Sequence, residues 1–240
     1  MEFRKYEING EKINFQDINE IAKSANDVYE SQCVTAVLFD KPINFSKKKL
    51  ENYSIDFWHM GSLENKDLKR NPNNECYYNI KPCNNTTYAN KCANCIEHNF
   101  PVNVRNKMRD KCVYRMSSID IFKQVIDKAN AMEDGLQIWK VEDYSSRRTK
   151  EINLKIRYQK ENIDYLIILN EKSEEYFFIT AYPIFEQREK NDLNKEYNSK
   201  SSTKIMKVVS PDVQGVEQKK LPVQRVVLNS PIRAYYWRGT

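Results

Sequence analysis

The sequence predicts an α+β fold in which an antiparallel β-meander of three to five strands packs with N-terminal and flanking helices and carries a Cys-rich zinc-knot insert. Three observations indicate this fold. Two stretches have apolar residues at helical spacing. Between residues 136 and 184, runs of apolar and aromatic residues alternate with short polar turns, which is typical of consecutive antiparallel strands. Five of the six cysteines lie within 37 residues, from Cys76 to Cys112.

The N-terminal part begins with a predicted amphipathic helix over residues 17–30, with Asp17 as its cap. Its apolar stripe consists of Ile18, Ile21, Ala22, Ala25, Val28 and Tyr29. The apolar run at residues 33–39 predicts a buried strand that ends at Asp40-Lys41-Pro42. Residues 46–75 are polar and predict no element.

The central part begins with a second helix, which Ser117 precedes and Gly135 ends. Its stripe consists of Ile119, Phe122, Val125, Ile126 and Ala129. A strand is then predicted from residue 136, followed by runs at residues 152–158, 163–170 and 176–184. In the first run Lys155 and Arg157 point to the face opposite Leu154, Ile156 and Tyr158. Strict alternation predicts that Tyr176, Phe178, Thr180 and Tyr182 share one face of the third run. A charged helix over residues 186–198, a linker over 199–220 and a last strand within 221–238 complete the prediction.

These patterns divide the chain into an N-terminal helix/strand region (1–75), the Cys-rich insert (76–112), a helix-plus-meander core (117–198) and a basic C-terminal extension (199–240). The net charge of +6 lies in the last part, where residues 200–240 hold 8 Lys and Arg against 2 Asp and Glu. A basic tail can bind phosphates by releasing counterions. A solvated tail without a partner explains the same charge.

Composition excludes several classes of protein. The chain has only 5 Gly and contains neither GxGxxG nor GxxxxGK[ST], which excludes dinucleotide and P-loop sites. No apolar run follows Arg4 and Lys5, so we expect no signal peptide. No stretch approaches the ~18 apolar residues of a membrane-spanning helix. We therefore expect a cytoplasmic protein without a membrane partner.

The clustered cysteines predict a structural zinc site, because clustered thiols in a chain without a secretory signal favour metal over disulfides. A CxxC pair allows two thiolates to bind one ion, and two further ligands complete a tetrahedron. The predicted ligands are Cys76, Cys83, Cys92 and Cys95, with Cys112 and His98 as alternatives. Buried thiols, or a redox pair at Cys92 and Cys95, remain open. Cys33 is predicted to be a small core residue.

Residues 117–197 also carry a resemblance. A helix leads to the strings NLKIRY (residues 153–158), DYLIIL (164–169) and YFFITAY (176–182), and a helix with Arg188 and LNKEY (193–197) follows. This arrangement resembles the phage-associated nuclease domains of the barnase–EndoU–colicin–RelE (BECR) superfamily. The most specific part is Thr180-Ala181-Tyr182, and the resemblance covers about a third of the chain.

The resemblance implies a metal-independent RNase of the toxin or phage–host conflict type, which cleaves by attack of the 2′-hydroxyl on the neighbouring phosphate. That chemistry needs a base, an acid and cations for the phosphorane charge. The implied catalytic residues are Arg157 and Lys155 for phosphate charge and Thr180 to hold a phosphate oxygen or orient the substrate. Tyr182 would stack a nucleobase or position the acid, and His59 would transfer a proton. A structural interpretation also fits: Lys155 and Arg157 alternate with core residues when one face of a sheet is wet, and His59 is then a core or interface residue.

A second class of function is a non-catalytic zinc-knot protein that binds nucleic acid or a host protein through its basic, aromatic tail. The predicted nucleic-acid contacts are Arg188, Arg233, Arg238, Tyr236 and Trp237. The absence of an obvious acid–base pair favours this class, whereas the strand pattern favours RNA cleavage. A protein antitoxin or host protein is a further expected partner of the enzyme.

Overall fold

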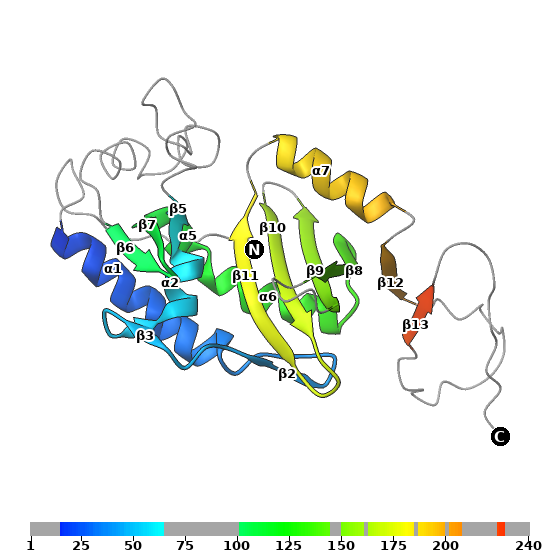
Figure 1. Ribbon diagram of the computed structural model, residues 1–240, viewed down its shortest axis with the longest axis horizontal. Coiled ribbons are helices and arrows are strands. Elements are labelled where there is room, and N and C mark those ends of the chain that lie inside the picture. The colour runs from blue at the N-terminus through cyan, green and yellow to red at the C-terminus, as the bar shows by residue number, and fades with distance from the viewer. Residues whose placement is uncertain are drawn as a thin grey trace.

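The computed structural model describes residues 15–64, 101–144, 150–160, 163–184, 187–199, 202–207 and 225–228 (Figure 1). The first elements are α1 (Phe15–Val28), the π-helical turn η1 (Tyr29–Cys33), β1 (Val37–Leu38), β2 (Lys41–Asn44), β3 (Lys49–Leu50), β4 (Tyr53–Ser54), α2 (Ile55–Gly61), β5 (Ser62–Glu64), β6 (Pro101–Val104) and β7 (Lys107–Lys111). The later elements are α5 (Val113–Ser117), α6 (Ile119–Asn130), β8 (Leu136–Tyr144), β9 (Lys150–Lys160), β10 (Ile163–Glu171), β11 (Tyr176–Pro183), α7 (Gln187–Asn198), β12 (Thr203–Lys207) and β13 (Arg225–Leu228).

One large sheet organises the described residues, with the strand order β1-β2-β11-β10-β9-β8-β12-β13. Strands β8 to β11 are antiparallel neighbours in sequence order, so the predicted meander is confirmed. Strand β2 pairs with β11 in parallel through Ile43 and Asn44. The N-terminal region therefore extends the sheet that the central region builds.

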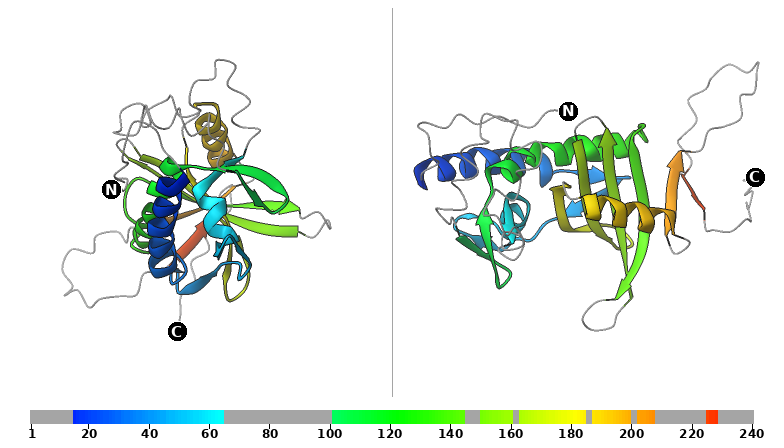
Figure 2. Two further views of the ribbon diagram at one scale, coloured as in Figure 1. Left: turned by 90° about the vertical axis from the view of Figure 1, so that its left-hand side faces the viewer. Right: turned by 90° about the horizontal axis from the view of Figure 1, so that it is seen from above.

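Helices cover both faces of the sheet. Helix α6 lies along one face and α7 crosses the other, while α1 lies in line with α6 beyond the edge of the sheet (Figure 2). Side chains from α1, α2, α6 and the meander form one continuous core. Its fully buried members, each 0% exposed, include Ile18, Phe57, Phe122, Ile156 and Ile167. The molecule is therefore a mixed α+β protein in which residues before and after the Cys-rich segment share a core.

Both predicted amphipathic helices are present. Each residue of the α1 stripe is at most 7% exposed, and the five stripe residues of α6 are at most 1% exposed. Helix α6 ends at Asn130, before Gly135, because its C-terminal turn is closed by backbone bonds from Ala131 and Met132. Gly135 has φ +87° and accepts a bond from the Gln159 amide (2.9 Å), so its role is to start β8.

The buried strand predicted over residues 33–39 is confirmed only at β1, Val37–Leu38. Helical backbone continues to Cys33, and a tight turn at Phe39 and Asp40 (φ 49° and 64°) joins two short strands instead. Asn130 holds this turn, accepting from the Phe39 amide (2.7 Å) and donating to the Val37 carbonyl (2.8 Å). Within β1 the Leu38 side chain is buried and the Val37 side chain is 46% exposed, so only one face of this short strand is buried.

Three other stretches contain elements that the sequence did not predict, one of them the end of the predicted Cys-rich insert, where β6 and β7 form a hairpin. Helix α2 lies within the polar stretch of residues 46–75, and its Trp58 and Met60 are each 1% exposed. The Ser54 hydroxyl caps this helix by accepting from the Asp56 amide (3.2 Å). Strand β12 lies in the predicted linker and pairs with β8. Among the described residues, no helix combines the length and the apolar character needed to cross a bilayer.

Candidate active site

The meander brings the four strand residues that the sequence singled out onto one face. Leu166 of β10 lies opposite both Arg157 and Tyr182, and Ile168 lies opposite both Lys155 and Thr180. The four side chains thus belong to two adjacent cross-strand rows of the face that α7 crosses (Figure 1). A small apolar cluster attaches α7 there: Trp139, Leu166, Ile184 and Leu193.

Arg157 lies beneath α7 and is 0% exposed. It forms a bidentate pair with Asp164, with Nε–Oδ1 and Nη2–Oδ2 distances of 2.7 and 2.6 Å, and its Nη1 donates to Asn194 Oδ1 of α7 (2.8 Å). Lys190 of α7 lies 3.7 Å from the same Asp164 carboxylate. A buried guanidinium needs such a complete set of partners. In this arrangement Arg157 holds α7 on the sheet and has no contact with solvent.

Lys155 makes a second polar link to α7. Its ammonium donates to both oxygens of Glu196 (2.7 and 2.8 Å), and the Trp139 indole donates to Glu196 Oε1 (2.8 Å). The Lys155 side chain is 15% exposed. One carboxylate of α7 thus ties together β8 and β9.

Tyr182 makes a third link, at the beginning of α7. Its hydroxyl donates to Glu189 Oε1 at 2.6 Å. The Arg115 guanidinium carbon lies 5.2 Å from the centroid of the Tyr182 ring, within the range of a cation–π contact. Arg115 Nη1 also donates to the Ser62 carbonyl (3.1 Å), which fixes the guanidinium between β5 and β11.

The residues around the Tyr182 hydroxyl are more accessible to solvent than Arg157. Tyr182, Glu189 and Arg115 are all half-buried, and Thr180 is half-buried two positions earlier on β11. A carboxylate, a phenol and a guanidinium therefore meet at the surface where the meander ends and α7 begins. We refer to Tyr182, Glu189 and Arg115 as the Tyr182 cluster.

His59 lies on α2, a helix that neighbours β11. Its backbone carbonyl accepts a bond from Arg109 Nη2 of β7 (3.4 Å). Arg109 is 4% exposed and also bonds Ser62, with Nε–Oγ and Nη2–O distances of 2.8 Å each. His59 is thus part of a buried polar junction between α2 and β7.

Most predicted nucleic-acid and metal residues lie outside the described residues: Arg233, Tyr236, Trp237, Arg238, Cys76, Cys83, Cys92, Cys95 and His98. Arg188 is described, and its side chain is 91% exposed with Nε 3.9 Å from Asp192. Cys33 is buried, as predicted, and its Sγ contacts the Ile119 carbonyl (3.6 Å). Within the described ranges no three His, Cys, Asp or Glu side chains are arranged to hold a metal ion.

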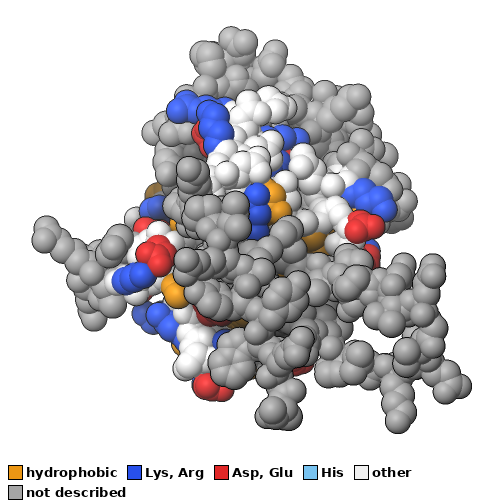
Figure 3. Space-filling model, turned by 90° about the vertical axis from the view of Figure 1, so that its right-hand side faces the viewer, with side chains coloured by type: hydrophobic (Ala, Val, Ile, Leu, Met, Phe, Trp, Pro, Cys, Tyr) orange, Lys and Arg blue, Asp and Glu red, His pale blue; other side chains and the backbone are white. Residues whose placement is uncertain are grey.

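Charge on the described surface is mixed. On the side shown in Figure 3, Lys and Arg side chains of the described residues lie next to Asp and Glu side chains. The basic excess of the chain belongs to residues 200–240, most of which are outside the described ranges. The described surface therefore offers local basic groups, such as Arg188 and Arg115, for binding an anion.

Sequence reasoning missed the residues of α7 and its neighbours that complete the face. These are Arg115, Asp164, Glu189, Asn194 and Glu196. One pattern was present: Glu189, Leu193 and Glu196 follow the i, i+4, i+7 spacing of one helix face. Leu193 marked that face as buried, so the two carboxylates beside it were candidates for contact with the sheet.

Comparison of the chain with known protein families, with curated protein sequences and with solved structures finds no significant match.

Proposed function

We propose that this protein is a metal-independent nuclease that cleaves RNA at the Tyr182 cluster. The observation that carries the proposal is the 2.6 Å hydrogen bond from the Tyr182 hydroxyl to Glu189, beside the Arg115 guanidinium. A carboxylate and a phenol in contact form an acid–base pair, and a guanidinium stabilises phosphate charge. Sequence reasoning lacked this pair, because Glu189 meets Tyr182 only when α7 docks on the sheet.

The three groups supply each part of an internal phosphoryl transfer. Glu189 takes the proton of the 2′-hydroxyl as the 2′-oxygen bonds to phosphorus. Arg115 stabilises the charge that develops on the phosphorane oxygens. Tyr182 gives its proton to the departing 5′-oxygen as the P–O5′ bond breaks. The products are a 2′,3′-cyclic phosphate and a 5′-hydroxyl, and the proton returns from Glu189 to Tyr182 through their hydrogen bond.

The remaining residues of the face take supporting roles in this proposal. Arg157 and Lys155 hold α7, and therefore Glu189, in register with β11 through Asn194 and Glu196. They are positioning residues, because substrate does not reach the buried Arg157. Thr180 lies on the same face as Tyr182, and in this proposal it binds a phosphate oxygen. His59 has no part in this mechanism.

The substrate class follows from the chemistry, because only RNA carries the 2′-hydroxyl that this reaction uses. The resemblance to phage-associated nuclease domains supports a toxin or phage–host conflict role, with a protein antitoxin or host protein as a partner. The cysteine spacing supports one structural zinc ion held by Cys76, Cys83, Cys92 and Cys95. A zinc bound by four thiolates has no open position for water, so cleavage by the Tyr182 cluster does not require it.

A specific observation also favours a non-catalytic binding protein. Arg157 and Lys155, the cations that the sequence placed at the phosphate, are both occupied by carboxylates of the protein itself. The attachment of α7 by these two cations explains their presence on β9 without any catalytic role. In that case nucleic acid or a host protein binds through the basic C-terminal extension.

The two functions are separated by incubating the full chain with total RNA in EDTA and determining the product ends. The nuclease proposal expects fragments with 2′,3′-cyclic phosphate and 5′-hydroxyl ends. Retarded but intact RNA in a gel-shift experiment supports the binding protein and contradicts cleavage. Cleavage that EDTA abolishes contradicts the metal-independent mechanism.

A further inference from the structure

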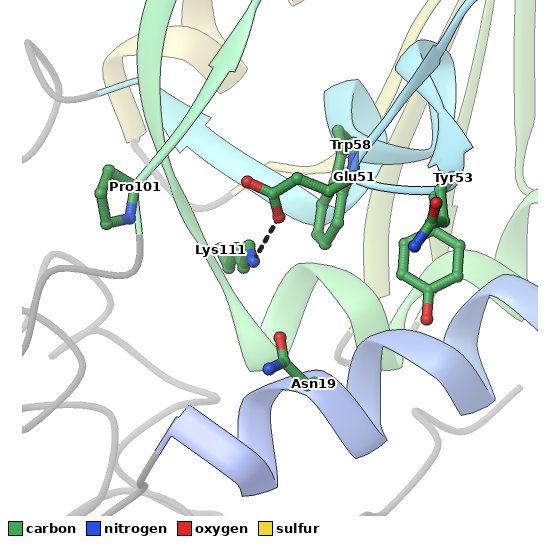
Figure 4. Close-up of a pocket in the computed structure, with 7 residues that line it drawn as sticks. Asn19, Glu51, Tyr53, Trp58, Pro101 and Lys111 are labelled. Carbon is green, nitrogen blue, oxygen red and sulfur yellow. Dashed lines mark ion pairs between the residues drawn. The ribbon is translucent and has the colours of Figure 1, made fainter.

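A second site is lined by residues that do not belong to the Tyr182 cluster. It is a pocket of about 430 Å³ between α1, the β3–β4 hairpin, α2 and the β6–β7 hairpin (Figure 4). Its lining consists of Asn19, Glu51, Asn52, Tyr53, Trp58, Pro101 and Lys111. The volume lies within the range of small-molecule sites, roughly 300–1,000 Å³.

A buried cation forms one wall of this pocket. The Lys111 side chain is 4% exposed, and its ammonium lies 4.8 Å from the centroid of the Trp58 ring. Glu51 Oε2 lies 2.7 Å from the same ammonium, as the dashed line in Figure 4 shows. A lysine this buried needs a negative partner, because removing an ammonium from water is unfavourable.

The side chain that pairs with this cation is much more exposed to solvent than the cation is. The Glu51 side chain is 46% exposed, whereas Lys111 is enclosed by protein. Glu51 belongs to the turn of the β3–β4 hairpin, where both Glu51 and Asn52 have left-handed backbone (φ 49° and 70°). An exposed carboxylate on a turn is readily replaced at Lys111 by the anionic group of a ligand, while Lys111 keeps its place over Trp58.

The other walls suit a planar ring. Tyr53 presents an aromatic ring to the pocket, held edge-on to Trp58 with centroids 5.5 Å apart. Asn19 projects toward the pocket from α1 (Figure 4). Asn52 of the hairpin also belongs to the lining and carries a second amide. An amide side chain offers both a donor and an acceptor, which matches the N6 and N7 atoms of adenine. Aromatic side chains stack on bases.

We propose that this pocket binds an adenine mononucleotide. The phosphate replaces the Glu51 carboxylate at Lys111, the base stacks on Tyr53, and the amides of Asn19 and Asn52 bond the edge of the base. This site is separate in its residues from the Tyr182 cluster and does not depend on the protein being a nuclease. Its function is to bind a small ligand, in addition to the reaction proposed above.

The test is equilibrium dialysis of the full chain against radiolabelled AMP, with Trp58 fluorescence recorded in parallel. Saturable binding of AMP is expected, with a dissociation constant about tenfold lower than that of adenosine or inorganic phosphate. Adenosine lacks the phosphate that pairs with Lys111, and inorganic phosphate lacks the base that stacks on Tyr53. Lys111→Met retains the aliphatic contact with Trp58 but removes the charge, so it should abolish AMP binding. Lys107→Met, on the same strand, is the matched control and should bind as the wild type does.

A second variant tests the exchange of partners at Lys111. Glu51→Gln removes the competing carboxylate and should tighten AMP binding, the opposite direction from Lys111→Met. Circular dichroism establishes that each variant is folded. The proposal is overturned by absence of saturable AMP binding to the folded wild type, by equal binding of AMP and phosphate, or by weaker binding to Glu51→Gln.

Discussion

The hydroxyl of Tyr182 donates a hydrogen bond of 2.6 Å to Glu189, and this contact joins the last strand of the meander to the first turn of α7. The two residues are seven positions apart, so the pair exists only when α7 lies on the sheet. Asn194, Glu196 and Lys190 of the same helix bond to the sheet residues Arg157, Lys155 and Asp164. The chemistry of the cluster therefore depends on how firmly α7 is attached.

Removing Arg157 should be among the most destabilising single changes in the chain. Arg157→Ala leaves the Asp164 carboxylate, itself 7% exposed, without its bidentate partner in the interior. Loss of one member of a buried pair costs about 3–5 kcal/mol. Urea unfolding followed by circular dichroism measures the change in the free energy of unfolding.

The double variant Arg157→Met/Asp164→Leu tests whether the lost stability comes from leaving one charge of the buried ion pair without its partner. With both charges removed, apolar side chains fill the space and most of the lost stability should return. A double variant as unstable as Arg157→Ala would contradict the account of Arg157 as half of a buried ion pair.

Breaking the Lys155–Glu196 link should loosen α7 without unfolding the protein. Glu196→Leu removes both the Lys155 pair and the Trp139 bond. Because these groups are partly exposed, a loss of about 1–2 kcal/mol is expected, confined to α7. Hydrogen exchange of the α7 amides should accelerate while that of α6 stays unchanged. Lys195→Met is the matched control, because the Lys195 side chain is 79% exposed, and it should leave the exchange of both helices unchanged.

Asp110 should make the protein less stable as pH rises. This β7 residue is 8% exposed, its Oδ1 has no hydrogen-bond partner within the described part of the chain, and burial raises the pKa of its carboxyl group. The folded state then holds the proton more tightly than the unfolded state, so stability falls as pH rises from the unfolded pKa through the higher folded pKa. Asp110→Asn should raise the free energy of unfolding at neutral pH and flatten its decline above about pH 4. A variant that is less stable than the wild type at neutral pH would contradict this assignment.

Zinc content tests the interpretation of the cysteine cluster. Protein purified without added metal should contain one zinc per chain by mass spectrometry, and Cys92→Ser should lose it. Cys33→Ala should retain the metal, because Cys33 is a core residue whose thiol pKa is raised by burial. Folded protein without zinc would rule out the knot.

The sequence predicted those parts of the fold that periodicity controls. Alternation placed Lys155 and Arg157 correctly on one face of β9. It was wrong for β11, where Tyr176 and Phe178 lie in the main core and Tyr182 lies on the opposite face, because the pairing register shifts between Ile168 and Leu169. Helical spacing correctly identified α1 and α6. Periodicity says nothing of what covers a face, so the burial of Arg157 under α7 could not be deduced from it.

Other features depend on tertiary contacts that have no local pattern. Helix α2 is short, and its Trp58 and Met60 are buried by packing against neighbours distant in sequence. The turn at Phe39 and Asp40 depends on Asn130, 91 positions from Phe39. Glu189 was visible only as one charge in a charged helix, because its partner Tyr182 lies on a different element.

The most direct test of the central claim is the rate of RNA cleavage in EDTA by the wild type and by Glu189→Gln. An amide keeps the hydrogen bond with Tyr182 but cannot accept the 2′-proton, so the rate should fall by about 100-fold or more. Glu142→Gln, a change at a glutamate 60% exposed on β8, serves as the matched control and should cleave at the wild-type rate. Cleavage by Glu189→Gln at the wild-type rate, or no cleavage by folded wild-type protein, would contradict catalysis at the Tyr182 cluster.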